Sequence, residues 1–151
     1  MIVPILMGSK SDKEFVEKIT DELDKLDLPH KEYVASAHKT PELVLEIVNE
    51  YNNLEEPVCF ITVAGRSNGL SGVTAASSIH PVIACPPFKD KDSYSINIHS
   101  TLQMPSQTPV LTVLDPKNVA LAVARILGLT NKELQEKVKQ GISEMKESFR
   151  K

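Results

Sequence analysis

The chain has 151 residues, of which 41% are hydrophobic and 25% charged. This is the size and composition of one globular domain that folds without disulfides or metal ions. Its net charge of −3 excludes nucleic acid as the main partner, because phosphate backbones require a basic surface. No apolar run approaches the ~20 residues of a membrane helix, and the first residues lack the features of a signal peptide. We therefore expect a cytoplasmic protein in which Cys59 and Cys85, both within apolar runs, are buried reduced thiols.

Short apolar runs alternate with amphipathic segments through the first third of the chain. We expect, in order, a strand at 2–7, a helix at 13–26, a strand at 32–35 and a helix at 41–51. Ser11, with Glu14 three residues later, fits a capping box at the start of the first helix. Pro41 suits the first turn of the second helix.

The remaining chain continues this alternation. We expect strands at 58–63, 82–85 and 110–114. One helix should follow the segment 64–69 and end near Ile79, and two further helices should span 118–127 and 132–149. The third strand is almost entirely apolar, as is typical of a strand that is covered on both faces. The polar stretch 89–107 is expected to be a long functional or flexible connection.

Five strands interleaved with helices indicate an α/β protein with a doubly wound parallel sheet in three layers. We expect the flavodoxin-like strand order 2-1-3-4-5, because five strands suit it and the Rossmann order has six. One domain would span residues 1–151, with a peripheral C-terminal helix at 131–150. Pro4 is awkward within the first strand, because it removes a hydrogen-bond donor from the ladder.

Three polar clusters follow the first three expected strands. Ligands of open parallel sheets bind outside the carboxyl ends of the strands, so we expect the three clusters to meet. They are the segments 8–12, 36–40 and 65–68.

The first two clusters suit a phosphorylated sugar. Hydroxyls and amides at a helix N-terminus bind phosphate, and Asp12 is a natural acceptor for ribose hydroxyls. The alternative is that Ser11 and Asp12 only cap the helix. In the second cluster His38 can exchange a proton near neutral pH and Lys39 can bind phosphate, although both residues could equally lie in a solvated loop.

The third cluster combines flexible backbone with donors. Gly65 would let the backbone approach a ligand, and Ser67 and Asn68 could orient a carboxylate or an imidazole nitrogen. The alternative is a simple turn at Asn68-Gly69. No dinucleotide or ATP-binding glycine motif occurs, and the histidine and cysteine spacing does not suggest a metal site.

Taken together, the three clusters resemble the motifs of the PurE family of purine biosynthesis, over about residues 2–128. The segments that carry the resemblance are Gly8-Ser9-Lys10-Ser11-Asp12, Ser36-Ala37-His38-Lys39-Thr40-Pro41, Ala64-Gly65-Arg66-Ser67-Asn68-Gly69-Leu70 and Leu102-Gln103-Met104-Pro105-Ser106. Lys39 and the Arg66-Ser67-Asn68 run resemble the carboxylase class, since the mutase class usually has Arg in place of Lys39. Ser71-Gly72 and Gln107 depart from the usual pattern, but remove no expected reacting group.

The resemblance implies reversible addition of carbon dioxide to 5-aminoimidazole ribonucleotide (AIR), giving the 4-carboxylate without ATP, biotin or metal. It implies a homo-oligomer, an octamer or a tetramer, that takes these small-molecule substrates. His38 would be the catalytic acid–base. The implied substrate-binding residues are Ser9, Asp12, Ser36, Lys39, Gly65 and Ser67.

Two alternatives stay open at this point. One is the mutase, which rearranges the N5-carboxylated ribonucleotide. The other is a non-enzymatic flavodoxin-like module, either a flavin binder or a receiver. The absence of Trp and an aromatic content of 5% argue against a flavin binder. Ala64-Gly65 stands where a receiver needs a carboxylate, which argues against a receiver.

Overall fold

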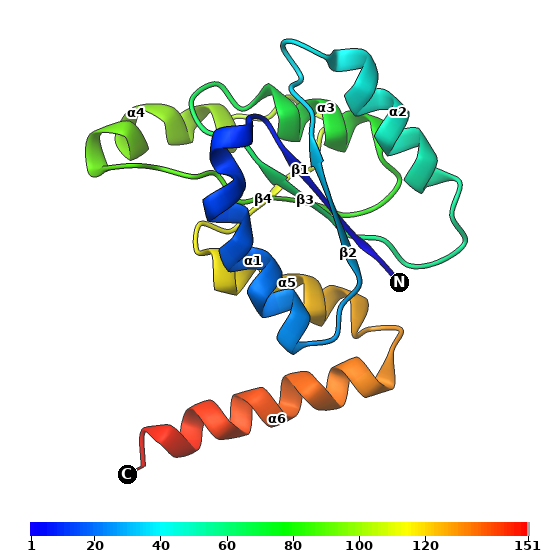
Figure 1. Ribbon diagram of the computed structural model, residues 1–151, viewed down its shortest axis with the longest axis vertical. Helices are drawn as coiled ribbons and strands as arrows, with labels where there is room; N and C mark the ends of the chain where they lie inside the picture. Colours follow the sequence, from blue (N-terminus) through cyan, green and yellow to red (C-terminus); the bar gives the residue numbers. More distant parts are fainter. Residues whose placement is uncertain (151) are drawn as a thin grey trace.

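A computed structural model describes residues 1–150 and contains one sheet of five parallel strands in the order β2-β1-β3-β4-β5 (Figure 1). This confirms the expected doubly wound, flavodoxin-like fold. The strands are β1 (Val3–Met7), β2 (His30–Val34), β3 (Phe60–Val63), β4 (Val82–Ala84) and β5 (Leu111–Thr112).

Helices cover both faces of this sheet. Helices α1 and α5 pack on one face and α2 and α3 on the other, so the protein has three layers (Figure 1). The helical segments are η1 (Lys10–Asp12), α1 (Lys13–Lys25), α2 (Pro41–Asn52), α3 (Gly69–Ser77), α4 (Lys91–Leu102), α5 (Pro116–Leu127) and α6 (Lys132–Ser148).

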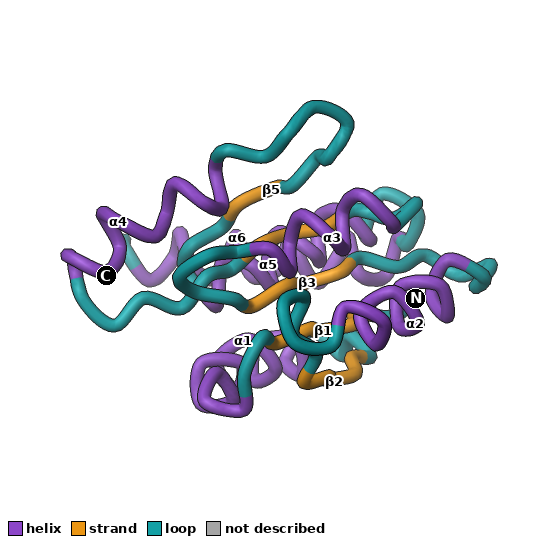
Figure 2. The backbone as a smooth tube through the Cα atoms, turned by 90° about the horizontal axis from the view of Figure 1, so that it is seen from above, coloured by secondary structure: helices purple, strands orange, loops and turns teal. Residues whose placement is uncertain are grey.

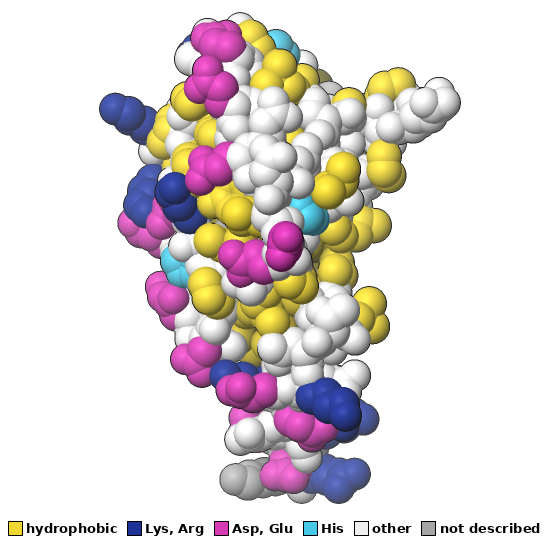
Figure 3. Space-filling model, turned by 90° about the vertical axis from the view of Figure 1, so that its right-hand side faces the viewer, with side chains coloured by type: hydrophobic (Ala, Val, Ile, Leu, Met, Phe, Trp, Pro, Cys, Tyr) yellow, Lys and Arg dark blue, Asp and Glu magenta, His cyan; other side chains and the backbone are white. Residues whose placement is uncertain are grey.

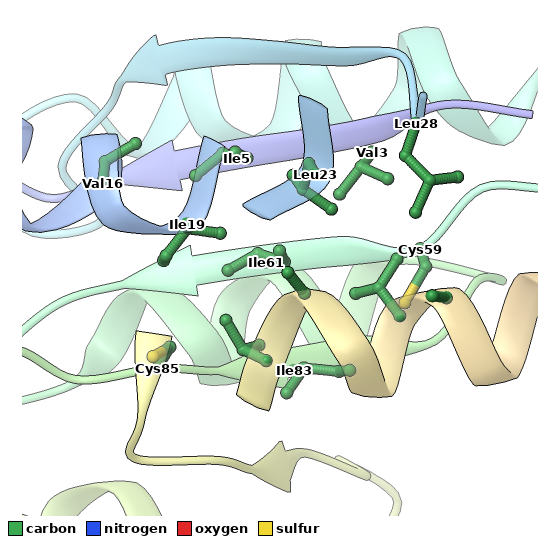
Figure 4. Close-up of a cluster of buried hydrophobic side chains, with 14 of the residues drawn as sticks. Val3, Ile5, Val16, Ile19, Leu23, Leu28, Cys59, Ile61, Ile83 and Cys85 are labelled. Atoms are coloured by element: carbon green, nitrogen blue, oxygen red, sulfur yellow. The ribbon is translucent and has the colours of Figure 1, made fainter. Parts of the chain in front are cut away.

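Two hydrophobic cores result from the alternation of side chains along the strands. In β1, Val3 and Ile5 point toward α1 and α5, while Leu6 points toward α2 and α3. In β3, Ile61 likewise points toward α1 and α5, and Phe60 points toward α2 and α3. Figure 4 shows the first core, in which side chains from α1 meet those of the strands. Each of these side chains contributes about 1.5–3 kcal/mol by leaving water.

Pro4 is accommodated at the start of the pairing between β1 and β3. The N–H groups of Ile2 and Gly8 donate toward β3, to the carbonyls of Pro57 and Val63. Pro4 lies in the same alternation, so its missing N–H removes one bond on this side only. Regular pairing of β1 with β3 begins at the next residue.

The largest departure from the expected elements is α4. The stretch 89–107, expected to be a connection, contains this helix of 12 residues. Its side chains are mostly polar, and only Ile98 and Thr101 are buried, so no apolar periodicity marks it. Strand β2 also begins two residues earlier than expected, and β5 is limited to two residues.

The C-terminal helix α6 extends away from the sheet (Figure 1). Leu134 and Val138 attach it to the core beside α5, while Met145 and Phe149 are exposed. In Figure 3, acidic and basic side chains mix over this end of the molecule, and hydrophobic side chains are scattered over the middle. None of the helices in residues 1–150 is long and apolar enough to cross a membrane.

Candidate active site

The carboxyl ends of β1, β2, β3 and β4 surround a pocket of about 610 Å³, a volume typical of small-molecule sites. The carboxyl ends of these strands lie at the upper edge of the sheet in Figure 1, and Figure 2 looks onto this edge. The catalytic and substrate-binding residues implied by the resemblance all line this pocket: Ser9, Asp12, Ser36, His38, Lys39, Gly65 and Ser67. The three polar clusters therefore converge, as their places after the strands predicted.

The loop after β1 is organised by Ser9. Its Oγ accepts hydrogen bonds from the backbone N–H of Ser11 at 3.2 Å and from the Ser11 hydroxyl at 2.9 Å. Asp12 occupies the N-cap position of α1 but makes no capping hydrogen bond with its side chain. The expected capping box of Ser11 and Glu14 is therefore wrong, because the inserted turn η1 directs Ser11 toward Ser9.

Among residues 1–150, Asp12 is the one carboxylate that lines the pocket. Burial raises the pKa of its carboxyl group above the ordinary value of 3.8, while a hydrogen bond from the Ser9 backbone and the charge of Lys89 act in the opposite direction. A partly desolvated carboxylate that does not cap its helix is available to accept hydrogen bonds from a ligand.

The loop after β2 is closed by Thr40 and presents His38 at its tip. The Thr40 hydroxyl accepts from the backbone N–H of Ser36 at 3.1 Å and lies 3.2 Å from the Ser36 carbonyl, to which it can donate. The His38 ring reaches the first residue of α3: a Cβ on Gly69 would lie only 3.0 Å from its Nε2. The absence of a side chain at Gly69 therefore leaves space for the imidazole.

The loop after β3 approaches other backbone closely. A Cβ on Gly65 would lie 3.0 Å from the carbonyl oxygen of Pro87, which is tighter than ordinary packing. Arg66 has φ of +52°, a conformation that non-glycine residues seldom adopt. The side chains of Arg66 and Ser67 are exposed within the pocket.

Asn68 differs from its neighbours because it is buried, with 3% of its surface exposed. Its Oδ1 accepts from the backbone N–H of Ser71 at 3.1 Å and caps α3, and its Nδ2 donates to the Thr101 hydroxyl at 2.9 Å. The expectation that Asn68 could orient a ligand is therefore wrong, because both ends of its amide bind within the protein.

A fourth wall of the pocket was missed by the sequence analysis. It comes from the end of β4 and from α4, and consists of Pro87, Phe88, Lys89, Ser93 and Asn97. The rule that located the other loops would have found it, since this segment also follows the carboxyl end of a strand. The stretch 89–107 was expected to be a functional or flexible connection, but none of its residues was assigned to the site formed by the other loops.

Positive charge dominates the pocket. Lys39, Arg66 and Lys89 line it, and the salt bridges formed within residues 1–150 include none of them. Such a site suits an anion with more than one negative charge. No group of three or more His, Cys, Asp or Glu side chains within 1–150 could hold a metal ion.

A family model described as AIR carboxylase matches residues 2–148. The chain belongs to the AIR carboxylase family. A relative from Archaeoglobus fulgidus, named phosphoribosylaminoimidazole carboxylase, is 48% identical over 136 residues, which cover 90% of this chain and 74% of that protein. One of the same name from Treponema denticola is 45% identical over 139 residues, covering 91% of this chain and 86% of that protein.

Solved structures agree with this membership. The crystal structure of Treponema denticola PurE matches with a TM-score of 0.94 and 41% identity, covering 98% of this chain and 93% of that one. The resemblance to the PurE family is therefore confirmed. Membership of a carboxylase family also decides against the non-enzymatic flavodoxin-like alternative.

Proposed function

We propose that this protein is an AIR carboxylase, which adds carbon dioxide reversibly to C4 of 5-aminoimidazole ribonucleotide in de novo purine biosynthesis. One observation carries the proposal: in a chain of the AIR carboxylase family, the loops after β1, β2 and β3 line a single cationic pocket. The names of the relatives from Archaeoglobus and Treponema support it.

The phosphoribosyl part of AIR fits the side of the pocket formed by the first two loops. Ser9 and Ser36 supply hydrogen-bond donors for the phosphate, and Lys39 supplies a compact positive charge. Asp12 accepts hydrogen bonds from the ribose hydroxyls. Anchoring this remote part of the substrate provides binding energy that orients the ring for reaction.

The reacting ring then lies toward His38, with Gly65 and Ser67 framing it. C4 of AIR is an enamine-like nucleophile, so its electron pair forms the new bond to the carbon of carbon dioxide and one C=O pair moves onto oxygen. C4 then bears both a carboxylate and a proton. Neutral His38 removes that proton, the C–H electrons return to the ring, and aromaticity is restored. In the reverse direction the imidazolium of His38 protonates C4 and carbon dioxide leaves.

This chemistry needs no further activation of carbon dioxide, because the ring carbon is itself nucleophilic. We therefore expect turnover without ATP, biotin or a metal ion. Unchanged rates of AIR carboxylation after exhaustive dialysis against EDTA, and without added nucleoside triphosphate, would support this expectation. Loss of activity that returns with one divalent metal would contradict it.

The deciding experiment offers two ribonucleotides side by side. Purified protein should form the 4-carboxylate from AIR in a manner that depends on dissolved carbon dioxide, and should exchange labelled carbon dioxide into the product. Rapid conversion of the N5-carboxylated ribonucleotide without such exchange would instead identify a mutase. No turnover of either compound would overturn the proposal.

We further propose that the enzyme acts in the cytoplasm, as a homo-oligomer of single-domain subunits, either an octamer or a tetramer. Two buried free thiols, Cys59 and Cys85, are consistent with a reducing compartment. Exposed apolar side chains on α4 and at the C-terminal end of α6, among them Ile96 and the C-cap residue Phe149, are consistent with contacts between subunits.

A further inference from the structure

Helix α4 contacts the loop that carries Arg66 and Ser67 through two consecutive hydroxyl side chains. The Ser100 hydroxyl accepts from the backbone N–H of Asn68 at 3.1 Å and lies 2.6 Å from the Arg66 carbonyl. One side chain therefore joins both ends of a three-residue turn. Its single proton could also reach the Asn97 carbonyl within α4, but that distance is longer, at 2.9 Å.

The contacts of Ser100 lie at a turn whose backbone conformation is unfavourable. The left-handed conformation of Arg66 is unfavourable for a side chain with a Cβ, and such conformations persist only where surrounding contacts hold them. The carbonyl that follows this strained φ is the one that Ser100 contacts. A change in this turn would move Ser67, the next residue along the chain.

Thr101 extends the connection into the core. Asn68 Nδ2 donates to its hydroxyl, while Asn68 Oδ1 accepts from the Ser71 hydroxyl at 2.8 Å. The Ser71 hydroxyl in turn lies 2.7 Å from that of Thr62 in β3. Every buried side-chain N and O atom in residues 1–150 has a hydrogen-bond partner, so the network is complete.

Asn68, a member of this network, is followed in the chain by the residue that faces the imidazole of His38. Gly69, the residue after Asn68, is the surface against which His38 packs. Helix α4 is therefore hydrogen-bonded to the β3–α3 loop, and this loop borders both the pocket and the ring of His38.

We propose that Ser100 is a positioning residue for carboxylation: together with Thr101 it holds residues 65–69 in the geometry that places Ser67 and Gly69 against the reacting ring and His38. This inference rests on the proposed function. It assigns a role in the reaction to α4, which has no apolar pattern and contributes little to either core.

The test compares Ser100→Ala with Ser95→Ala. Ser95 lies on the same helix, and its hydroxyl lies 2.9 Å from the carbonyl of Lys91 within α4, so it reproduces the loss of one helical hydroxyl without touching the loop. We expect S100A to lower kcat about 10- to 100-fold with little change in the Kd for AIR, because the phosphate is held by other loops. S95A should match the wild type, and Ser100→Thr, which retains the hydroxyl, should restore most of the rate.

Hydrogen exchange supplies a readout that does not depend on turnover. In S100A the amide of Asn68 loses its acceptor, so residues 65–69 should exchange faster than in the wild type, S95A or S100T. Thr101→Val removes the acceptor for Asn68 Nδ2 at constant shape and should produce the same combination of low kcat and faster exchange.

Two results would overturn the proposal: a kcat for S100A that stays within about twofold of the wild type, or an equal loss in S100T or S95A. Inactive wild-type protein with the expected exchange pattern would instead reject the proposed function and leave the positioning of the loop intact.

Discussion

The imidazole of His38 reaches from the loop after β2 to the first residue of α3, with its Nε2 facing Gly69. It is the one histidine that lines the pocket. The others are engaged or lie elsewhere: His30 contacts Asp24 at 2.9 Å, and His80 contacts the Tyr51 carbonyl at 3.1 Å. Position therefore selects His38 as the acid–base of the proposed reaction.

His38→Asn should lower kcat by about 10²- to 10⁴-fold, because an amide keeps the approximate shape of the ring but cannot take up the proton from C4. Binding of AIR should persist, since in the proposed complex the phosphate contacts Ser9, Ser36 and Lys39 rather than His38. Steady-state rates and calorimetric Kd values separate the two effects. His99→Asn, on an exposed part of α4 outside the pocket, is the control. A near-normal rate in H38N would remove His38 from the mechanism.

Asp12→Asn should weaken binding of AIR without harming the fold. Burial raises the pKa of this carboxyl group, so the folded state holds its proton more tightly than the unfolded state. Stability is therefore lost as the pH rises from the ordinary value of 3.8 through the raised value.

Removing that charge should raise Tm at pH 7. The difference in Tm between D12N and the wild type should shrink as the pH falls toward 3.8. Thermal unfolding across this range and a binding titration at pH 7 check both statements. Tight binding of AIR by D12N would show that Asp12 does not hold the ribose.

The sequence located the pocket residues but not the role of each. Gly65, Ser67 and His38 follow from the rule that places ligands at the ends of parallel strands. Asn68 was misjudged because a motif does not reveal whether an amide faces a ligand or a buried hydroxyl such as that of Thr101. Ser11 was misjudged because the short turn η1 shifted the start of the helix.

At the scale of elements, the start of α3 has to accept a neighbouring ring. Gly69→Ala would place a Cβ 3.0 Å from His38 Nε2 and 3.1 Å from its Cε1. The φ of this glycine is not positive, so alanine fits the backbone and the fold should persist. The imidazole must move, and we expect kcat to fall about tenfold or more.

Gly141→Ala in α6 is the matched control for this change, because its Cβ would meet no atom within 4 Å. It should stabilise the protein by about 0.5–1 kcal/mol through helix propensity, with an unchanged rate. Urea unfolding and steady-state kinetics on both variants provide the comparison. Equal rates in G69A and the wild type would contradict the proposed packing of His38.

Helix α4 shows why one element escaped the sequence analysis. Amphipathic periodicity found α1, α2 and α5, each of which buries four or five residues against the sheet. Helix α4 buries two, and its remaining residues face solvent or the pocket. The available signal was its N-cap, where Asp90 accepts from the backbone N–H of Ser93 at 2.7 Å.

At the scale of the whole molecule, the strand order could be predicted because five strands interleaved with helices suit the flavodoxin-like order. The full burial of β1 and β3 agrees with their central places in the sheet. The extent of β5 could not be predicted. Strand β5 pairs only with β4, and half-exposed Leu111 lies at its start. The paired strand is therefore shorter than the apolar run 110–114.

Exposed apolar side chains are spread over α4, β5 and the C-terminal end of α6, including Ile96, Leu111 and the C-cap residue Phe149. We expect sedimentation at equilibrium to give four or eight times the subunit mass of 16.7 kDa. Phe149→Ser combined with Met145→Ser should leave the subunit fold unchanged by circular dichroism, because neither residue belongs to a core. A single species of 16.7 kDa in the wild type would refute the oligomer.

Cys59 and Cys85 lie in the core between the sheet and the α1–α5 layer, with no surface exposed. Burial raises the pKa of each thiol to about 12, so a reactive thiolate is scarce at neutral pH even before steric protection is considered. An alkylating reagent can therefore modify them only when this layer separates from the sheet. The rate of alkylation then measures how often the folded enzyme opens, without any introduced label.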